Sequence, residues 1–127
     1  MLRAILVDDE KSNLENLTVL LNRHCPNVSI VGVAQTFADA NILYQKTQPN
    51  LIFLDIQLGN RLGFELLEIL AGKHFEVIFI TAYDHYGIKA VKFSALDYIL
   101  KPIATDELIS AVAKATTKIS QQLDNNQ

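Results

Sequence analysis

The sequence predicts an α/β domain in which five parallel strands form one sheet with helices on both faces, a three-layer (βα)5 sandwich. Short apolar runs alternate with segments of helical periodicity along the 127 residues. Continuous apolar runs are typical of strands that are buried on both faces of a parallel sheet. Alternating strands and helices with right-handed crossovers build such a sheet.

The predicted strands are Ala4–Val7, Ile30–Ala34, Leu51–Leu54, Val77–Ile80 and Tyr98–Leu100. For five strand–helix units at this length, the leading arrangement is the flavodoxin-like strand order 2-1-3-4-5. This order makes the first and third strands neighbours in the middle of the sheet.

Helical spacing of apolar residues separates these runs. Residues at i, i+3 and i+7 are Leu14, Leu17 and Leu21, then Phe37, Ala40 and Tyr44, then Phe64, Leu67 and Ala71. A weaker segment surrounds Ile88 and Val91. The last helix carries Leu108, Val112, Ala115 and Ile119 on one face, and Thr105 followed by two acidic residues is typical of a helix start.

Length and composition favour one cytoplasmic domain. We expect it to span residues 1–120, with residues 121–127 as a polar tail that is a linker or the cut end of a longer protein. The net charge of −3 gives no general attraction to nucleic acid or to an anionic membrane. Cys25 is the single cysteine, which suits a reducing compartment, and we expect an inert thiol. No apolar run is long enough for a signal peptide or a membrane span.

Polar residues follow the predicted strands at the edge where ligands bind in such sheets. They are Asp8 and Asp9 after the first strand, Asp55 after the third, Thr81 after the fourth and Lys101 after the fifth. Converging carboxylates repel one another and need a compensating cation, for which Mg²⁺ is suited because it takes oxygen ligands. A carboxylate–Mg²⁺ site beside a lysine and a threonine hydroxyl can also receive a phosphoryl group. A glycine-rich phosphate loop is missing, which argues against a bound nucleotide.

Four segments resemble response-regulator receiver domains of the CheY-like superfamily. These are Val7–Glu10, Phe53–Ile56, Ile80–Ala82 and Tyr98–Pro102. Residues 81–86 and 95–103 further resemble the LytTR subgroup of regulators. The resemblance implies a two-component phosphoprotein that acts as a switch and not as an enzyme. Asp55 would accept a phosphoryl group from a sensor histidine kinase, with Mg²⁺ as cofactor and Mn²⁺ as a substitute.

The same resemblance implies a role for each site residue. Asp9, Asp55 and the backbone carbonyl of Gln57 would bind Mg²⁺ directly, and Asp8 would act through a bound water. Beside the acceptor, Lys101, Thr81 and the backbone N–H of Ala82 would contact the phosphoryl group.

The resemblance also implies residues that carry the conformational switch and residues that set the lifetime of the phosphoryl group. Thr81 would move towards the phosphoryl group while Tyr98 turns inward, and Gln57 and Tyr83 would tune dephosphorylation. The Lys101–Pro102 peptide bond is expected to be cis. Many receivers have a proline four residues after the acceptor, where this chain has Gly59, which allows some flexibility of the loop, while the glycine at Gly63 is retained.

The expected output surface is formed by the fourth helix, the fifth strand and the fifth helix. Candidate residues for a homodimer on it are Tyr86, Ile88, Tyr98 and Ala111. DNA would be contacted only by an attached LytTR-type DNA-binding domain, which is not among these 127 residues. We therefore expect an excised receiver from a longer transcription factor, without direct contact to a membrane.

Other interpretations weigh less. Singly, the acidic residues could stabilise a helix N-terminus or a turn, Lys101 could be a solvated surface residue and Tyr98 could serve packing. A phosphatase of the haloacid-dehalogenase type needs a second acid where Gln57 stands. A flavin binder needs a Ser/Thr/Gly-rich loop where Asp8, Asp9 and Glu10 would repel the flavin phosphate. A receiver-like module that takes no phosphate remains the last alternative.

Overall fold

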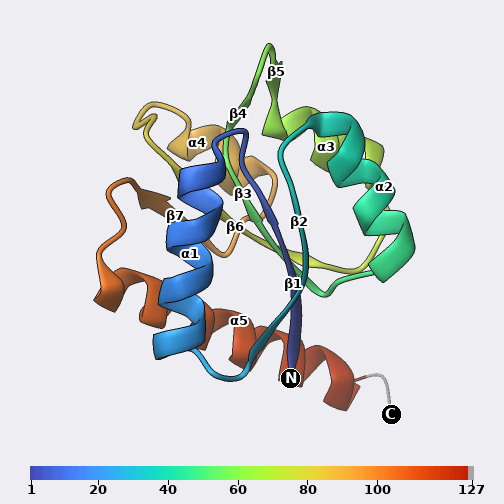
Figure 1. Ribbon diagram of the computed structural model, residues 1–127. Helices are drawn as coiled ribbons and strands as arrows, with labels where there is room; N and C mark the ends of the chain where they lie inside the picture. Colours follow the sequence, from blue (N-terminus) through green and yellow to red (C-terminus); the bar gives the residue numbers. More distant parts are fainter. Residues whose placement is uncertain (126–127) are drawn as a thin grey trace.

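Residues 1–125 of the computed structural model form three layers around one parallel sheet (Figure 1). The strands are β1 (Leu2–Val7), β2 (Val28–Ala34), β3 (Leu51–Leu54), β6 (Glu76–Thr81) and β7 (Asp97–Leu100). Their order in the sheet is β2-β1-β3-β6-β7, and all neighbouring pairs are parallel. Because β6 and β7 are the fourth and fifth strands of this sheet along the chain, the order confirms the predicted 2-1-3-4-5 arrangement.

The central strands end in register at one edge of the sheet. Val7 of β1 pairs with Ala34 of β2 and with Leu54 of β3. Beyond these pairs the backbone ladder continues by one residue. The N–H of Asp8 donates to the carbonyl of Ala34 at 3.1 Å. The N–H of Asp55 donates to the carbonyl of Val7 at 3.0 Å. Asp8 and Asp55 are therefore held side by side by main-chain hydrogen bonds.

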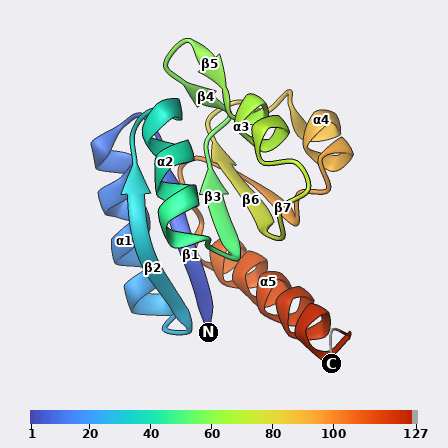
Figure 2. The ribbon, with the colours of Figure 1, turned by 90° about the vertical axis from the view of Figure 1, so that its right-hand side faces the viewer.

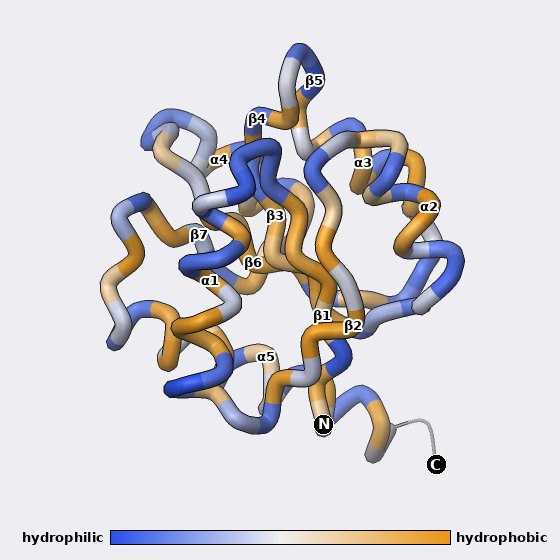
Figure 3. The backbone as a smooth tube through the Cα atoms, in the orientation of Figure 1, coloured by the Kyte–Doolittle hydropathy of each residue, from blue (hydrophilic) through white to orange (hydrophobic). Residues whose placement is uncertain are grey.

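Helices cover both faces of the sheet (Figures 1 and 2). One face carries α1 (Lys11–His24) and α5 (Thr105–Asn125), and the other carries α2 (Phe37–Thr47), α3 (Gly63–Ile69) and α4 (Gly87–Lys92). The apolar strand residues point alternately into these two halves of the core, and Figure 3 shows the hydrophobic stretches converging on the sheet. The central strands β1, β3 and β6 are thus largely buried on both faces, as their apolar sequences require, while the edge strands β2 and β7 are only partly buried.

The three long helices bury the faces that their periodicity predicts. The buried positions include Leu14, Leu17 and Leu21 in α1, Phe37, Ala40 and Tyr44 in α2, and Leu108, Val112, Ala115 and Ile119 in α5. The Thr36 hydroxyl caps α2 by accepting the N–H of Asp39 at 3.1 Å. The α5 helix starts at Thr105, as the start signal predicts.

The two short helices differ from the predicted pattern. The α3 helix ends at Ile69, so Ala71 is exposed and lies outside the helix. Gly72 has φ +87° and turns the chain there, which ends the helix before its predicted third position. In α4 the apolar pair Ile88 and Val91 faces solvent, with 79% and 75% of these residues exposed, while Ala90 is buried.

A small hairpin follows Asp55 where the sequence suggested a flexible loop. Its strands are β4 (Gln57–Leu58) and β5 (Arg61–Leu62), and Figures 1 and 2 show it projecting beyond the carboxyl ends of the sheet strands. Gly59 and Asn60 form the two-residue connection, and Gly59 has φ +61°, the left-handed conformation that glycine adopts without strain. A Gly-Asn pair between Leu58 and Arg61-Leu62 is a hairpin signal that the sequence interpretation missed.

The last helix reaches beyond residue 120. It continues to Asn125, and the side-chain amide of Gln122 donates to Glu76 Oε2 at 2.8 Å. The end of the domain at residue 120 stays a prediction, and residues 126 and 127 of the expected tail lie outside the described residues. Across residues 1–125, none of the helices combines the length and the apolar character needed to cross a membrane.

Candidate functional site

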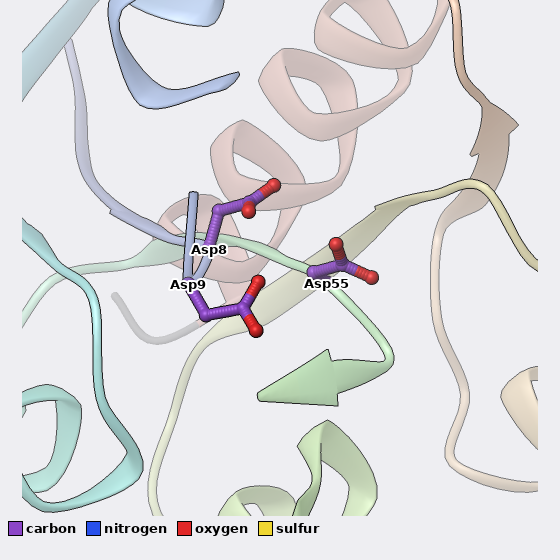
Figure 4. Close-up of side chains that lie close together, drawn as sticks. All are labelled: Asp8, Asp9 and Asp55. Carbon is purple, nitrogen blue, oxygen red and sulfur yellow. The ribbon is translucent and has the colours of Figure 1, made fainter. Parts of the chain in front are cut away.

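Three carboxylates meet at the edge where β1 and β3 end. Asp8 and Asp9 follow β1 and Asp55 follows β3, and Figure 4 shows their side chains gathered at this point. One oxygen of each lies within 4.8 Å of the others. Asp8 and Asp55 are buried, with 7% and 6% exposed, whereas Asp9 is exposed. Such a group of partly desolvated like charges needs a cation for stability.

Lys101 supplies one positive charge. Its Nζ lies 2.7 Å from Asp8 Oδ2 and 2.8 Å from Asp55 Oδ2. The backbone N–H of Lys101 donates to the carbonyl of Thr81 at 2.9 Å, which fixes the residue at the end of β7. The peptide bond between Lys101 and Pro102 is cis, as expected from the sequence.

The ammonium group of Lys101 is stabilised in its charged form. Burial lowers the pKa of Lys101, but hydrogen bonds from the ammonium to Asp55 and Asp8, and the negative charges of both, outweigh it, so the pKa is raised overall. Lys101 is therefore protonated at neutral pH. One ammonium facing three carboxylates leaves the cluster with a negative charge when all three are ionised.

The two acidic residues after β1 are oriented by further hydrogen bonds. Asp8 Oδ1 accepts the N–H of Glu10 at 2.9 Å and the side-chain amide of Asn13 at 3.3 Å. Asp9 Oδ2 accepts the N–H of Gly59 from the hairpin at 3.0 Å. The sequence interpretation missed Asn13 and this use of Gly59. A polar residue in the first turn of α1, next to the acidic pair, was the available signal for Asn13.

The chemistry of this donor set fits a hard divalent cation. Carboxylate oxygens are the ligands that Mg²⁺ prefers, and Mg²⁺ is commonly bound by one or two carboxylates together with waters and phosphate oxygens. Asp9 is exposed to solvent, so the cluster is accessible from outside. Asp8, Asp9 and Asp55 could together hold such an ion.

Thr81 and its neighbours lie at the end of β6. Thr81 is fully buried, and its Oγ1 accepts the N–H of Tyr83 at 3.3 Å. Ala82 between them is exposed. The hydroxyl of Tyr98, on β7, donates to the backbone carbonyl of Tyr83. Burial is the main cause that raises the pKa of Tyr98, whose side chain packs against the α2–α3–α4 half of the core.

Gln57 belongs to both the site and the hairpin. Its N–H donates to Asp55 Oδ1 at 3.3 Å, while its side-chain amide donates to the carbonyl of Gly59 at 2.6 Å. Gln57 is half-buried, whereas Tyr83 is 41% exposed. The side chain of Gln57 is thus bound to the hairpin turn.

A cavity of about 380 Å³ adjoins the carboxylates. It is lined by Asp8, Asp55 and Lys101 at the site, and by Leu17, Phe53 and Ile103 where it extends beneath α1. The cluster therefore has open space beside it rather than a closed wall of side chains.

Comparison with known proteins places this geometry in context. Residues 4–113 match the family model described as response regulator receiver domain. The chain is 36% identical over 127 residues to the sensory transduction protein LytT of Enterococcus faecalis, covering 98% of this chain and 52% of that protein. It is 35% identical over 123 residues to the transcriptional regulatory protein BtsR of Escherichia coli K12, covering 96% and 51%.

Solved structures give the same result. The response regulatory domain of mrkE from Klebsiella pneumoniae superposes with a TM-score of 0.85 at 30% identity, covering 94% of this chain and 98% of that one. The chain spans about half the length of the curated relatives it matches. Its similarity to them therefore concerns one of their parts.

Proposed function

The chain belongs to the response regulator receiver domain family, and on this premise we propose that Asp55 accepts a phosphoryl group from a sensor histidine kinase in a Mg²⁺-dependent reaction. One observation carries the assignment to Asp55. It is buried in the carboxylate cluster and lies 2.8 Å from the ammonium of Lys101. Members of this family act in general as regulatory switches rather than as catalysts.

The proposed reaction is a transfer between two side chains. A carboxylate oxygen of Asp55 attacks the phosphorus of a phosphohistidine on the kinase, and a P–O bond forms. The P–N bond breaks, and its electron pair returns to the imidazole nitrogen of the kinase. Lys101 stays charged through this reaction, because its pKa is raised by Asp55 and Asp8 despite burial. Its ammonium is available to pair with a phosphoryl oxygen.

Asp8, Asp9, Asp55 and the backbone carbonyl of Gln57 are the proposed metal ligands, with Asp8 acting through a bound water. A Mg²⁺ ion there would neutralise charge on the phosphoryl oxygens, and Mn²⁺ would substitute for it. The short distances between the three carboxylates support this set. Lys101 now contacts two of these carboxylates, so we infer that it exchanges part of these contacts for the phosphoryl group.

The switch is proposed to run through Thr81 and Tyr98. The Thr81 hydroxyl and the Ala82 N–H would contact the phosphoryl group, and Thr81 would give up its bond to the Tyr83 N–H. Tyr98 would leave the Tyr83 carbonyl and turn inward. A local charge then selects between two arrangements of β6 and β7. Gln57 and Tyr83 are proposed to set the lifetime of the phosphoryl group.

The proposed output surface consists of α4, β7 and α5. Its exposed apolar residues Ile88, Val91 and Leu100 support a homodimer there, and Tyr86 and Tyr98 are half-buried beside them. Ala111 was a candidate for the same contact, but it lies on the inner face of α5, fully buried in the core, and is withdrawn. Sedimentation velocity with and without a phosphoryl analogue tests the dimer.

Target and location are inferred from the relatives. One of them is named a transcriptional regulatory protein and is about twice as long as the matched region. We propose that a LytTR-type DNA-binding domain outside this sequence contacts DNA, and that the phosphorylated receiver controls it from within the cytoplasm. The domain itself has a net charge of −3, which does not favour direct contact with DNA.

Beryllofluoride tests the proposed site directly, because it mimics a phosphoryl group on a carboxylate. Fluorine NMR of the parent protein should show a bound signal that requires Mg²⁺ and disappears on adding EDTA. The Asp55→Asn variant should show none. A bound signal that persists in Asp55→Asn, or its absence in a folded parent protein, would contradict the assignment.

A further inference from the structure

The exposed carboxylate of Asp9 is oriented by a segment far away in the sequence. Its Oδ2 accepts the N–H of Gly59, at the tip of the β4–β5 hairpin, at 3.0 Å. The carbonyl of Gly59 in turn accepts the side-chain amide of Gln57 at 2.6 Å. The hairpin tip therefore contacts one proposed metal ligand, Asp9, and the first strand of the hairpin contains Gln57, whose carbonyl is another proposed ligand.

Two side-chain contacts of Arg61 hold the hairpin in place. Its guanidinium carbon lies 3.6 Å from the centre of the Phe37 ring, at the start of α2. Its Nη2 lies 3.5 Å from Glu65 Oε1 in α3. Stacking of a guanidinium on an aromatic ring is attractive and directional, because the planar cation lies against the negative face of the ring. Arg61 thus links the hairpin to two helices at once.

Glu65 completes this anchor. Its Oε2 accepts the N–H of Leu62 at 2.8 Å, while its other oxygen faces Arg61. The hydrogen bond from the Leu62 backbone is the main cause that lowers the pKa of Glu65, and the charge of Arg61 adds to it. Glu65 is therefore ionised at neutral pH and binds both the main chain and the side chain of β5.

We propose that Arg61 is a positioning residue of the metal site, which fixes the hairpin against α2 and α3 so that Gly59 holds Asp9 in a binding orientation. Arg61 is not itself a ligand. This inference rests on the proposed function, since it assumes that Asp9 belongs to a divalent-cation site. It also gives the hairpin a role that the family's general function does not specify.

If Arg61 acted only through its charge, its removal would change the metal affinity in the opposite direction from the one expected if it positions the hairpin. A cation near the site repels Mg²⁺ or Mn²⁺, so removing its charge alone should strengthen metal binding. Removing the anchor should instead loosen Gly59 and weaken metal binding. The direction of the change therefore distinguishes the two effects without any assumption about their size.

Mn²⁺ binding, measured by electron paramagnetic resonance of the free ion, is the test. The parent protein is compared with Arg61→Ala, with Arg61→Lys and with a control, Arg23→Ala. Arg23 is exposed in the last turn of α1, so its loss matches the charge change away from the hairpin. We expect Arg61→Ala to raise the Mn²⁺ dissociation constant about threefold, which corresponds to the loss of one exposed cation–π contact.

Arg61→Lys should also weaken binding, because an ammonium keeps the charge but lacks the flat surface that stacks on Phe37. Hydrogen exchange at the Gly59 amide in metal-free protein should be faster in both variants, with the urea midpoint close to that of the parent. Unchanged or tighter Mn²⁺ binding in both variants would overturn the inference while leaving the proposed function intact. A parent protein that binds no Mn²⁺ would overturn both.

Discussion

The ammonium nitrogen of Lys101 lies 2.8 Å from Oδ2 of Asp55, although their strands β7 and β3 are separated in the sheet by β6. The same nitrogen lies 2.7 Å from Oδ2 of Asp8, which follows β1. Lys101 therefore joins the ends of the three strands β1, β3 and β7. Asp8 and Asp55 pair with Lys101 and are also proposed metal ligands, so the stability of the fold and the binding of a metal ion are coupled at this site.

Lys101→Met should strongly destabilise the metal-free protein. The substitution leaves Asp8 and Asp55 buried without their counterion, and losing one partner of a largely buried pair costs on the order of 3 kcal/mol of unfolding free energy. Urea denaturation in EDTA measures this loss. Added Mg²⁺ should restore more stability in Lys101→Met than in the parent, since the metal ion would replace the missing ammonium beside these carboxylates.

Lys114→Met is the matched control for that variant. Lys114 forms an exposed ion pair with Asp97 at 3.0 Å, so its loss should cost less than about 1 kcal/mol. Equal losses for the two methionine variants would show that the Lys101 bridge does not stabilise the metal-free site.

Gly63→Ala should disturb the segment behind the acceptor. A Cβ atom at Gly63 would lie 2.4 Å from the backbone oxygen of Asp55, so the main chain must shift. We expect a loss of about 1–3 kcal/mol in unfolding free energy, typical of overpacking, measured by chemical denaturation.

Gly87→Ala tests whether that effect is local. A Cβ at Gly87, the first residue of α4, would meet nothing within 4 Å, and alanine favours the helix. Its stability should be equal to or slightly above that of the parent. A loss at Gly87 as large as that at Gly63 would mean that the close contact with Asp55 is not the cause.

The sheet could be predicted from the sequence because its strands are buried on both faces and read as unbroken apolar runs. A search for apolar runs did not find the short β4–β5 hairpin that follows Asp55. There the hairpin is only two residues deep on each side, and its stability comes from Asp9, Phe37 and Glu65 rather than from periodicity. The contacts with Asp9 and Phe37 join segments that are remote in the sequence and leave no local pattern, whereas the Gly59–Asn60 pair was a local signal that was missed.

The candidate site divides in the same way. Asp8, Asp55 and Lys101 could be placed together because the strand order brings their strand ends to one edge. The orienting roles of Asn13 and Gly59 depend on side-chain direction and on a turn conformation, which spacing does not specify. In α4, the apolar pair Ile88 and Val91 obeys helical spacing yet faces solvent, because spacing does not tell which face a neighbour covers.

Cys25 should react slowly with thiol reagents in the folded protein. The residue is 3% exposed, and burial raises the pKa of its thiol, so less thiolate is present near neutral pH than in a free cysteine. Its alkylation by iodoacetamide at pH 8 should be at least about tenfold slower in the folded state than in urea. Equal rates in both conditions would show that the C-terminal end of α1 opens readily.

Tyr98 should make the stability of the protein depend on pH in the alkaline range. Burial raises the pKa of Tyr98, so its neutral form is favoured in the folded protein. The resulting stabilisation is complete below the unfolded pKa of about 10 and is lost as pH rises through the higher folded pKa. Ultraviolet titration of the parent and of Tyr98→Phe isolates this group. A Tyr98 that titrates below pH 10 would contradict its burial against the core.

The proposed role of Asp55 as phosphoryl acceptor can be checked by intact mass spectrometry after incubation with acetyl phosphate and Mg²⁺. One added phosphoryl group is expected on the parent protein, absent with EDTA and absent in Asp55→Asn. An adduct of the same size that survives in Asp55→Asn would contradict it, as would a folded parent that gains no mass from acetyl phosphate and binds no beryllofluoride.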